Sequence, residues 1–330
     1  MSAVRRWQAL ACLVAGVLAW PAGPAAAADG DYPTRAIRLV VTTPAGSGMD
    51  VAARMLAEAL RETLGQPVVV DNRSGGDGLI AIRFVQAAAP DGYTWLVTSS
   101  GQMSIIPLLH DTPPYDAERD FVPVTIFARY PLALVSVPSL PVHSLGELAA
   151  YTRAQPRPLE YGSASNVYRV GTEMYLQQSG ARMRPIPYRG VPAVVNALLA
   201  GEVQVAIINV IAAAPLVASG KLRALAVTGD TRDPALPGTP TFVEAGLSDY
   251  TFATWAGVFA PVGTPAALVQ RMHAAIVEAT GSAAMRGRFA AADITPVAIG
   301  RDAMKAVMAG DRVTYGPLAR EVRADDVNVR

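Results

Sequence analysis

Short apolar runs alternate with amphipathic segments along almost the whole chain. The first run, IRLVVTT, leads through a small-residue turn into a segment with helical spacing of apolar residues, which predicts a helix over residues 50–64. The order repeats in PVVVDN, in a helix expected over residues 79–88, and in DGYTWLVTSSG. These runs lack clean alternation of apolar and polar positions, which is typical of parallel strands covered on both faces. The pattern therefore predicts an α/β fold.

The same rhythm restarts after FVPVTIFARYPLALVSV. Strands LEYGSAS, MRPIPY, VQVAIINV and LRALAVTG alternate with helices expected over residues 145–155, 171–179, 191–200 and 212–219. The extended stretch YTFATWAGVFAP then returns to the first set, and three more helices are expected, over residues 265–280, 283–292 and 301–322. We expect two lobes, each a mostly parallel sheet flanked by helices. Their predicted extents are residues 29–129 plus 252–330 for the first lobe and residues 130–251 for the second.

The N-terminus has the three-part layout of a secretory signal peptide. Arg5 and Arg6 precede an apolar run over residues 9–20, and small residues follow it. The run is shorter than the ~20 residues that a membrane-spanning helix needs, so we expect a protein that is not membrane-embedded. Cleavage of residues 1–28 would place the mature chain in the periplasm. The arginine pair leaves twin-arginine export open, although Gln8 stands where that signal usually has an apolar residue.

Charge and cysteine content exclude several classes of function. Cys12 is the only cysteine and would leave with the signal, which excludes disulfides, thiolate metal sites and a cysteine nucleophile. Without the two arginines of the signal the chain carries 26 basic and 27 acidic side chains, a formal net charge of −1, so there is no basic field for nucleic acid. His110, His143 and His273 have no partner at metal-ligand spacing, and no GxSxG motif occurs. We expect no metal, no cofactor and no catalytic residue.

The turn after IRLVVTT also admits a nucleotide-binding interpretation. Gly46-Ser47-Gly48 gives G-x-G, and Asp71 ends the next strand near the place of a ribose-binding acid. However, Val51 stands at the third glycine position, and Asp50 puts a carboxylate where a pyrophosphate would lie. A nucleotide-binding protein or a secreted enzyme therefore remains a minor alternative.

Five loops with small polar residues share one position relative to the predicted strands. TPAGSGMD, TSSGQ, YGSASN, PYRGVPA and INVIAA all follow strands, several of them directly before helices. Loops at the carboxyl ends of parallel strands line the ligand crevice of an open α/β sheet. Backbone N–H groups, hydroxyls and amides at such loops suit a small anion that undergoes no covalent chemistry. The sequence predicts a ligand cleft between the two lobes.

An ordered series of motifs resembles one known family. The series includes YPTRAIRLVV, GSGMDVAARMLAEAL, LGQPVVVDNRSGGDG, AAPDGYTWLV, YGSASN, GKLRALAVTGDTRDPALPGTPTFVEAG and FAPVGTP. From Tyr32 to about Val322 the chain resembles the substrate-binding proteins of tripartite tricarboxylate transporters, the Bug family. The resemblance implies a type II periplasmic-binding-protein fold that closes on a carboxylate and delivers it to membrane permease subunits. We expect a monomer, and the missing acid–base pair disfavours an enzyme.

The resemblance further implies where the ligand binds. In the family, a ligand carboxylate lies between the loop after the first strand and facing loops of the second lobe. The matching positions in this sequence are Gly46, Ser47, Gly48, Ser99, Ser100, Ser163 and Asn166. Asp50 matches the aspartate of the first loop, and we assign it to supporting the start of the helix.

The predicted pocket departs from the family pattern at several positions. Tyr168 and Arg169 stand where the family usually has a small-polar run with a histidine, and Ile208 replaces an aspartate beside Asn209. Loss of that carboxylate disfavours ligands with an ammonium group and favours a larger or less polar carboxylate. Arg169, in a loop expected to face the cleft, is a candidate clamp for a second carboxylate. A ligand-sensing adaptor for a membrane receptor would use the same cleft and remains the main alternative.

Overall fold

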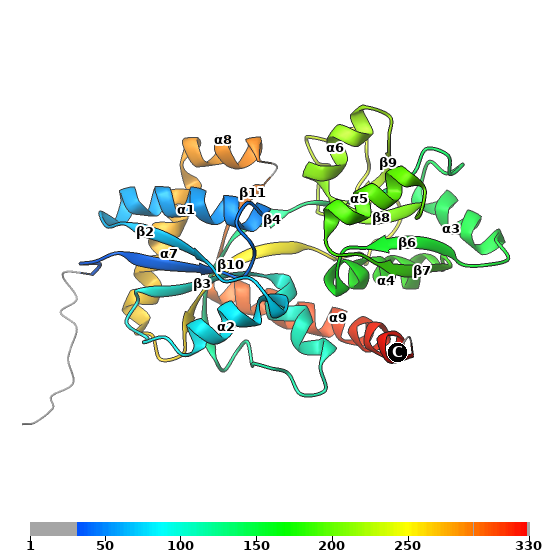
Figure 1. The fold of residues 1–330 in the computed structure, drawn as a ribbon. Coiled ribbons are helices and arrows are strands. Elements are labelled where there is room, and N and C mark those ends of the chain that lie inside the picture. Colours follow the sequence, from blue (N-terminus) through cyan, green and yellow to red (C-terminus); the bar gives the residue numbers. More distant parts are fainter. Residues whose placement is uncertain (1–31, 293, 329–330) are drawn as a thin grey trace, which may run out of the picture. The chain divides into compact units, whose positions relative to one another are not determined.

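The computed structural model describes residues 32–292 and 294–328, with the side chains of residues 323–328 excepted. The predicted signal peptide over residues 1–28 lies outside the described residues. Within them, the strands form two sheets (Figure 1).

The first sheet has six strands in the order β11-β4-β10-β3-β1-β2. These strands are β1 (Ile37–Val41), β2 (Val68–Asn72), β3 (Thr94–Ser99), β4 (Phe121–Tyr130), β10 (Thr254–Pro261) and β11 (Thr295–Gly300). The second sheet has five strands in the order β7-β6-β8-β5-β9. These strands are β5 (Leu132–Ser136), β6 (Leu159–Ser163), β7 (Met183–Pro187), β8 (Val205–Asn209) and β9 (Arg223–Val227).

Helices cover both faces of each sheet. In the first set, α1 (Gly48–Leu64), α7 (Ala266–Gly281) and α8 (Ala283–Ala291) pack together on one face, and α2 (Leu79–Gln86) and the start of α9 (Arg301–Asn328) pack on the other. The second set contains α3 (Leu145–Ala154), α4 (Asn166–Ser179), α5 (Val191–Ala200) and α6 (Val210–Ala218). Figure 1 shows α5 and α6 on the opposite side of this sheet from α4.

The predicted α/β fold with two sheets is confirmed, but the sheets are mixed rather than mostly parallel. Four of the nine strand pairs within the described residues are parallel and five are antiparallel. The antiparallel pairs arise where β4, β5 and β10 carry the chain between the sheets. The sequence analysis missed β11, a short edge strand that contains Pro296 and a register shift.

The chain passes from one sheet to the other through a single residue, Pro131. Tyr130 ends β4 opposite Thr254 of β10, and Leu132 begins β5 opposite Asn209 of β8. The Pro131 carbonyl accepts a hydrogen bond from Val210 N at 3.0 Å. This crossover therefore places the edge of the first sheet at which β4 ends next to the edge of the second sheet at which β5 begins.

Helix α9 adds a connection that the sequence analysis did not foresee. Tyr315, Leu318 and Val322 belong to the hydrophobic core of the second sheet, although α9 begins beside the first. Figure 1 shows the red end of α9 beside α4. The predicted assignment of residues 252–330 to the first lobe remains a prediction, and this packing makes α9 common to both cores.

The start of α1 is built around a buried aspartate. Ser47 caps the helix by accepting a hydrogen bond from Asp50 N at 3.2 Å. The Asp50 carboxylate accepts from Gly46 N at 2.8 Å, Asn72 Nδ2 at 2.9 Å and Arg54 Nε at 3.0 Å. Burial would raise the pKa of Asp50, but the hydrogen bonds from Arg54, Gly46 and Asn72 outweigh burial and lower it. The charged form of Asp50 thus holds the turn against the helix.

A glycine inside α4 permits close packing against the segment that leads from β9 back to β10. A Cβ at Gly171 would lie 2.6 Å from Phe252 Cε1, and Tyr250 donates a hydrogen bond to the Gly171 carbonyl at 3.1 Å. The sequence analysis took Gly171 as the start of this helix, but α4 begins five residues earlier, at Asn166. Gly171 is there to admit the aromatic ring.

Asp50→Asn should destabilise the fold by about 1–3 kcal/mol at pH 7, because it removes charge-assisted hydrogen bonds. Since the folded-state pKa is depressed, this stability is present above the unfolded-state pKa and is lost as pH falls below about 4. Urea unfolding of both proteins at pH 7, 5 and 3 should show the difference shrinking at the lowest pH. Asp91→Asn, which breaks only an exposed ion pair with Arg35, is the control and should change little. A difference that stays constant with pH would contradict a role for the charge.

Gly171→Ala should lower the free energy of unfolding by about 1–3 kcal/mol, because the added methyl group meets a buried ring. Gly287→Ala in α8 is the matched control, since a Cβ there has no heavy atom within 4 Å and the backbone is helical. That control should be neutral or stabilising by up to about 1 kcal/mol. Chemical unfolding measures both, and equal effects would argue against the packing explanation.

Candidate functional site

The predicted ligand residues lie at the two sheet edges that Pro131 joins. The strands β1 and β3 are parallel, so the loops that follow them leave the same edge of the first sheet. The same holds for β6 and β8 in the second sheet. Ser99 ends β3, Ser163 ends β6, and Asn209 ends β8 opposite Leu132. The strand directions and the crossover thus bring together loops that are far apart in sequence.

The loop after β1 is closed on itself by its own side chains. The Gly46 N–H points to Asp50, and Ser47 N donates to the Pro44 carbonyl at 3.3 Å. The Oγ atoms of Ser47 and Thr43 are 2.7 Å apart. Gly46 has φ of 83°, a conformation that favours glycine, and Gly48 is exposed at the first helical position. Gly48 is exposed at the start of α1, where backbone N–H groups can face a ligand.

The two serines that follow β3 have different environments. Ser99 is partly exposed, hydrogen-bonds to Gln102 and accepts from Gly101 N at 3.2 Å. Ser100 is fully buried, and its Oγ accepts from Trp255 N at 3.4 Å and lies 3.5 Å from the Ala253 carbonyl. Ser100 therefore attaches the loop to the crossing strand β10. Of the two, Ser99 is the one positioned for a ligand.

A π-helix continues the chain directly after these serines, where the sequence analysis expected only a loop. It spans Gly101–Ile105, and isolated π-helical turns occur frequently at functional sites. Ser104 in this turn donates a hydrogen bond to Asp311 Oδ2 of α9 at 2.7 Å, and Trp255 Nε1 donates to the same oxygen at 3.4 Å. Burial raises the pKa of Asp311. This partly buried carboxylate holds the π-helix against α9 and β10.

On the second sheet, Asn166 and Tyr168 lie at the start of α4 rather than in a loop, while Ser163 and Asn209 end strands. Ser163 is almost buried and donates to the Ser165 carbonyl at 3.0 Å, while Asn166 is exposed in the first turn. The Tyr168 hydroxyl donates to Asn209 Oδ1 at 2.7 Å, so these two predicted residues contact each other. Asn166 and the Tyr168–Asn209 pair thus form the surface of the second sheet at the shared edge.

The expectation that Arg169 stands in a loop is wrong, while its role as a clamp for a second carboxylate stays a prediction. Arg169 is a residue of α4, its side chain is 6% exposed, and its Nε lies 3.7 Å from Glu173 Oε1. Glu173 also accepts a hydrogen bond from the Tyr161 hydroxyl at 2.7 Å. A helix places Arg169 one turn before Glu173, which explains the pairing. The arginine thus forms an ion pair with a partly buried glutamate of its own helix.

The two sides of the candidate site are in close contact at Gly101 and Val167. A Cβ at Gly101 would lie 2.9 Å from Val167 Cγ2 of α4 and 3.2 Å from Ser99 Oγ. Neither residue is among those predicted from the sequence to bind the ligand. Gly101 follows the TSS run directly, and its lack of a side chain allows the π-helix and α4 to touch.

A small cavity lies at the crossover itself. It has a volume of about 260 Å³ and is lined from both sheets, by Arg129, Tyr130, Pro131, residues 228–234, Ala253, Thr254 and Thr295. Arg129 Nη1 lies 3.9 Å from Asp230 Oδ2 across this region. The sequence analysis assigned none of these residues to the site.

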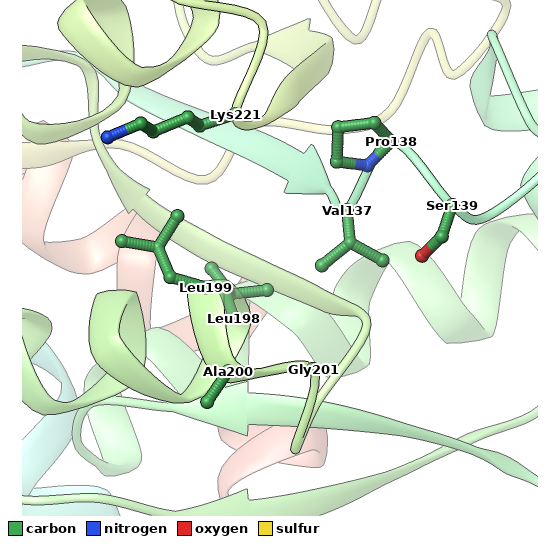
Figure 2. Close-up of a pocket in the computed structure, with 8 residues that line it drawn as sticks. All are labelled: Val137, Pro138, Ser139, Leu198, Leu199, Ala200, Gly201 and Lys221. Carbon is green, nitrogen blue, oxygen red and sulfur yellow. The ribbon is translucent and has the colours of Figure 1, made fainter.

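Another hollow, of about 550 Å³, lies at the far end of the second sheet (Figure 2). Val137 on its rim follows Ser136, which pairs with Val205, the first residue of β8. Asn209 is the last residue of β8, so the whole strand separates this hollow from the candidate site. In Figure 2, Leu199 and Lys221 lie on one side of this hollow and Ser139 lies on the other.

Two further features bear on chemistry. Among residues 32–292 and 294–328, no group of three His, Cys, Asp or Glu side chains is placed to hold a metal ion. Over the same ranges, no helix combines the length and the apolar character needed to cross a bilayer. The arrangement at the shared edge offers hydroxyls, amides and a helix start, which can bind an anion through hydrogen bonds.

Comparisons with known proteins identify the same architecture in relatives. Protein BugT from Bordetella pertussis is 37% identical over 319 residues, which cover 94% of this chain and 97% of BugT. The structure of R. palustris Rpa4515 with adipate is 33% identical, with a TM-score of 0.77, over 89% of this chain and 99% of that one. MatC (Rpa3494) from Rhodopseudomonas palustris with bound malate is 27% identical, with a TM-score of 0.73, over 87% of this chain and 100% of that one.

A family model confirms the resemblance inferred from the ordered motifs. The model described as "Tripartite tricarboxylate transporter family receptor" matches residues 52–322, which include most of both sheets and their helices. The chain therefore belongs to the tripartite tricarboxylate transporter receptor family.

Proposed function

We propose that this protein captures a small organic carboxylate at the edge shared by its two sheets and delivers it to the permease subunits of a tripartite transporter. The observation that carries this proposal is the convergence of the loops after β1, β3, β6 and β8 at the Pro131 crossover. Family membership and the relatives with bound adipate and malate support a carboxylate as the ligand. A dicarboxylate is the class to test first.

The proposed ligand contacts are a subset of the residues expected from the sequence. Gly48 and Ser99 would contact the ligand from the first sheet, and Asn166, Tyr168 and Asn209 from the second. Gly46, Ser47 and Asp50 would shape the first loop, Ser100 and Ser163 would hold the neighbouring backbone, and Arg169 would hold α4 through Glu173. The protein would bind and release its ligand without chemical turnover.

We also propose where the protein acts and in which oligomeric state. The N-terminal pattern and the family together support export, with residues 1–28 as a cleaved signal and the periplasm as the place of action. Sequencing the N-terminus of protein purified from periplasmic extract tests the cleavage. The mature protein would act as a monomer, which size-exclusion chromatography with light scattering can measure.

Gly48→Leu should weaken carboxylate binding at least 100-fold, because the side chain would cover the exposed helix start. A Cβ at Gly48 meets only Tyr130 Cε1, at 3.8 Å, so the variant should fold. Gly146→Leu, in the first turn of α3 with no heavy atom within 4 Å of its Cβ, is the matched control and should bind normally. Calorimetric titration with adipate, malate, acetate and benzoate gives the affinities. Unchanged affinity in Gly48→Leu would place the ligand elsewhere.

Gly101→Ala should weaken ligand binding about tenfold, a loss of about 1.4 kcal/mol, because the methyl group would hold the π-helix away from Val167. The double variant with Val167→Ala should recover most of the affinity, since it removes the atom that the methyl group meets. Small-angle scattering of the wild type should show compaction on ligand binding and less compaction in Gly101→Ala. Failure of the double variant to recover, with normal folding, would contradict this contact as part of closure.

A further inference from the structure

Tyr130 is fixed at the junction of the two sheets. It is the last residue of β4 and directly precedes Pro131. Its carbonyl accepts a hydrogen bond from Thr254 Oγ1 at 2.7 Å, and the next carbonyl, that of Pro131, accepts from Val210 N at 3.0 Å. Hydrogen bonds from β10 and from the start of α6 therefore hold this backbone in place. The position of the Tyr130 ring is set by the fold rather than by a mobile loop.

The ring lies beside the exposed start of α1. Tyr130 Cε1 is 3.8 Å from the position that a Cβ of Gly48 would occupy. The hydroxyl oxygen is two bonds from Cε1, so it lies in the same neighbourhood. Tyr130 also lines the 260 Å³ cavity to which both sheets contribute. The hydroxyl is thus close to the helix start, the loop after β1 and the crossover.

The Tyr130 hydroxyl is buried and has no hydrogen-bond partner among the described residues. Other tyrosines with enclosed hydroxyls do have partners: Tyr161 donates to Glu173, Tyr168 to Asn209, Tyr175 to the Leu145 carbonyl and Tyr250 to the Gly171 carbonyl. A buried polar group without a partner costs stability, so it calls for an explanation. A hydroxyl that is satisfied only when a ligand binds is such an explanation.

The chemistry of this hydroxyl suits an anionic ligand. Burial raises the pKa of Tyr130 above its usual range, so the phenol stays protonated and can donate a hydrogen bond. The nearby helix start adds positive potential, which favours a carboxylate.

We propose that the Tyr130 hydroxyl donates a hydrogen bond to a carboxylate group of the ligand at the start of α1, and that it helps to select carboxylates. This inference rests on the proposed function and adds a residue of the crossover to the binding site. It gives the junction between the sheets a direct contact with the ligand, in addition to its role in connecting them.

Tyr130→Phe tests the proposal because it removes only the hydroxyl. The variant should bind its best carboxylate about 10- to 100-fold more weakly, the loss expected for a hydrogen bond to a charged group. Without ligand it should be at least as stable as the wild type, because the lost hydroxyl had no partner. Titration calorimetry with adipate, malate, acetate and benzoate gives the affinities, and urea unfolding without ligand gives the stability.

Tyr175→Phe is the matched control. Its hydroxyl donates to the Leu145 carbonyl at 3.0 Å, within the core of the second sheet. This control should lose stability and keep its affinity, the reverse of the pattern expected for Tyr130→Phe.

The outcomes separate this inference from the proposed function. If the wild type binds none of the four carboxylates, the proposed function fails, and the role of Tyr130 fails with it. If the wild type binds a carboxylate and Tyr130→Phe binds it equally well, the inference alone is overturned. If Tyr130→Phe loses stability as Tyr175→Phe does, the hydroxyl has a structural partner, such as a bound water, and the inference is also overturned.

Discussion

Backbone hydrogen bonds on either side of one proline determine the geometry of this protein. Tyr130 is paired in the first sheet and Leu132 in the second, and Leu132 also exchanges hydrogen bonds with Thr228 at 3.0 and 2.8 Å. Because only Pro131 separates them, the edges of the two sheets must lie next to each other. The loops at those edges then face a common region whatever their own sequences are. The proposed binding site is in this sense a consequence of strand pairing, and its side chains would determine which ligand is held.

Two charged groups at this edge make contacts within the protein. Asp50 takes the Gly46 N–H that an anion would otherwise use, and Arg169 is paired with Glu173 inside the second half. The predicted ligand residues that remain are uncharged: an exposed helix start, hydroxyls and amides. Neutral donors cost less to desolvate on binding than a charged side chain would, and they hold an anion less tightly, which suits a protein that must deliver its ligand.

Much of the fold could be predicted because strand and helix periods are local properties. The order of elements and the two sheets followed from apolar runs and turn residues, and the ordered motifs gave the family. The errors came from long-range packing. Gly171 was predicted to start a helix, but it lies inside α4, where the lack of a side chain makes room for Phe252, 81 positions further on. Arg169 pairs with Glu173 because α4 begins at Asn166 and includes both residues, and the predicted helix began too late to show this. Tyr130 has no local motif that indicates its position beside Gly48.

Helix α9 has a consequence for how affinity is set. It supports the π-helix through Asp311 and Ser104, and it packs Tyr315 and Leu318 into the core of the second sheet. Any relative movement of the two halves must therefore strain or remake contacts along this helix, at a distance from the ligand. Apparent affinity depends on the fraction of molecules already in the binding-competent arrangement. Substitutions in α9 that never touch the ligand can therefore change the population of the binding-competent arrangement. They would then shift the ligand concentration at which the protein is half-saturated.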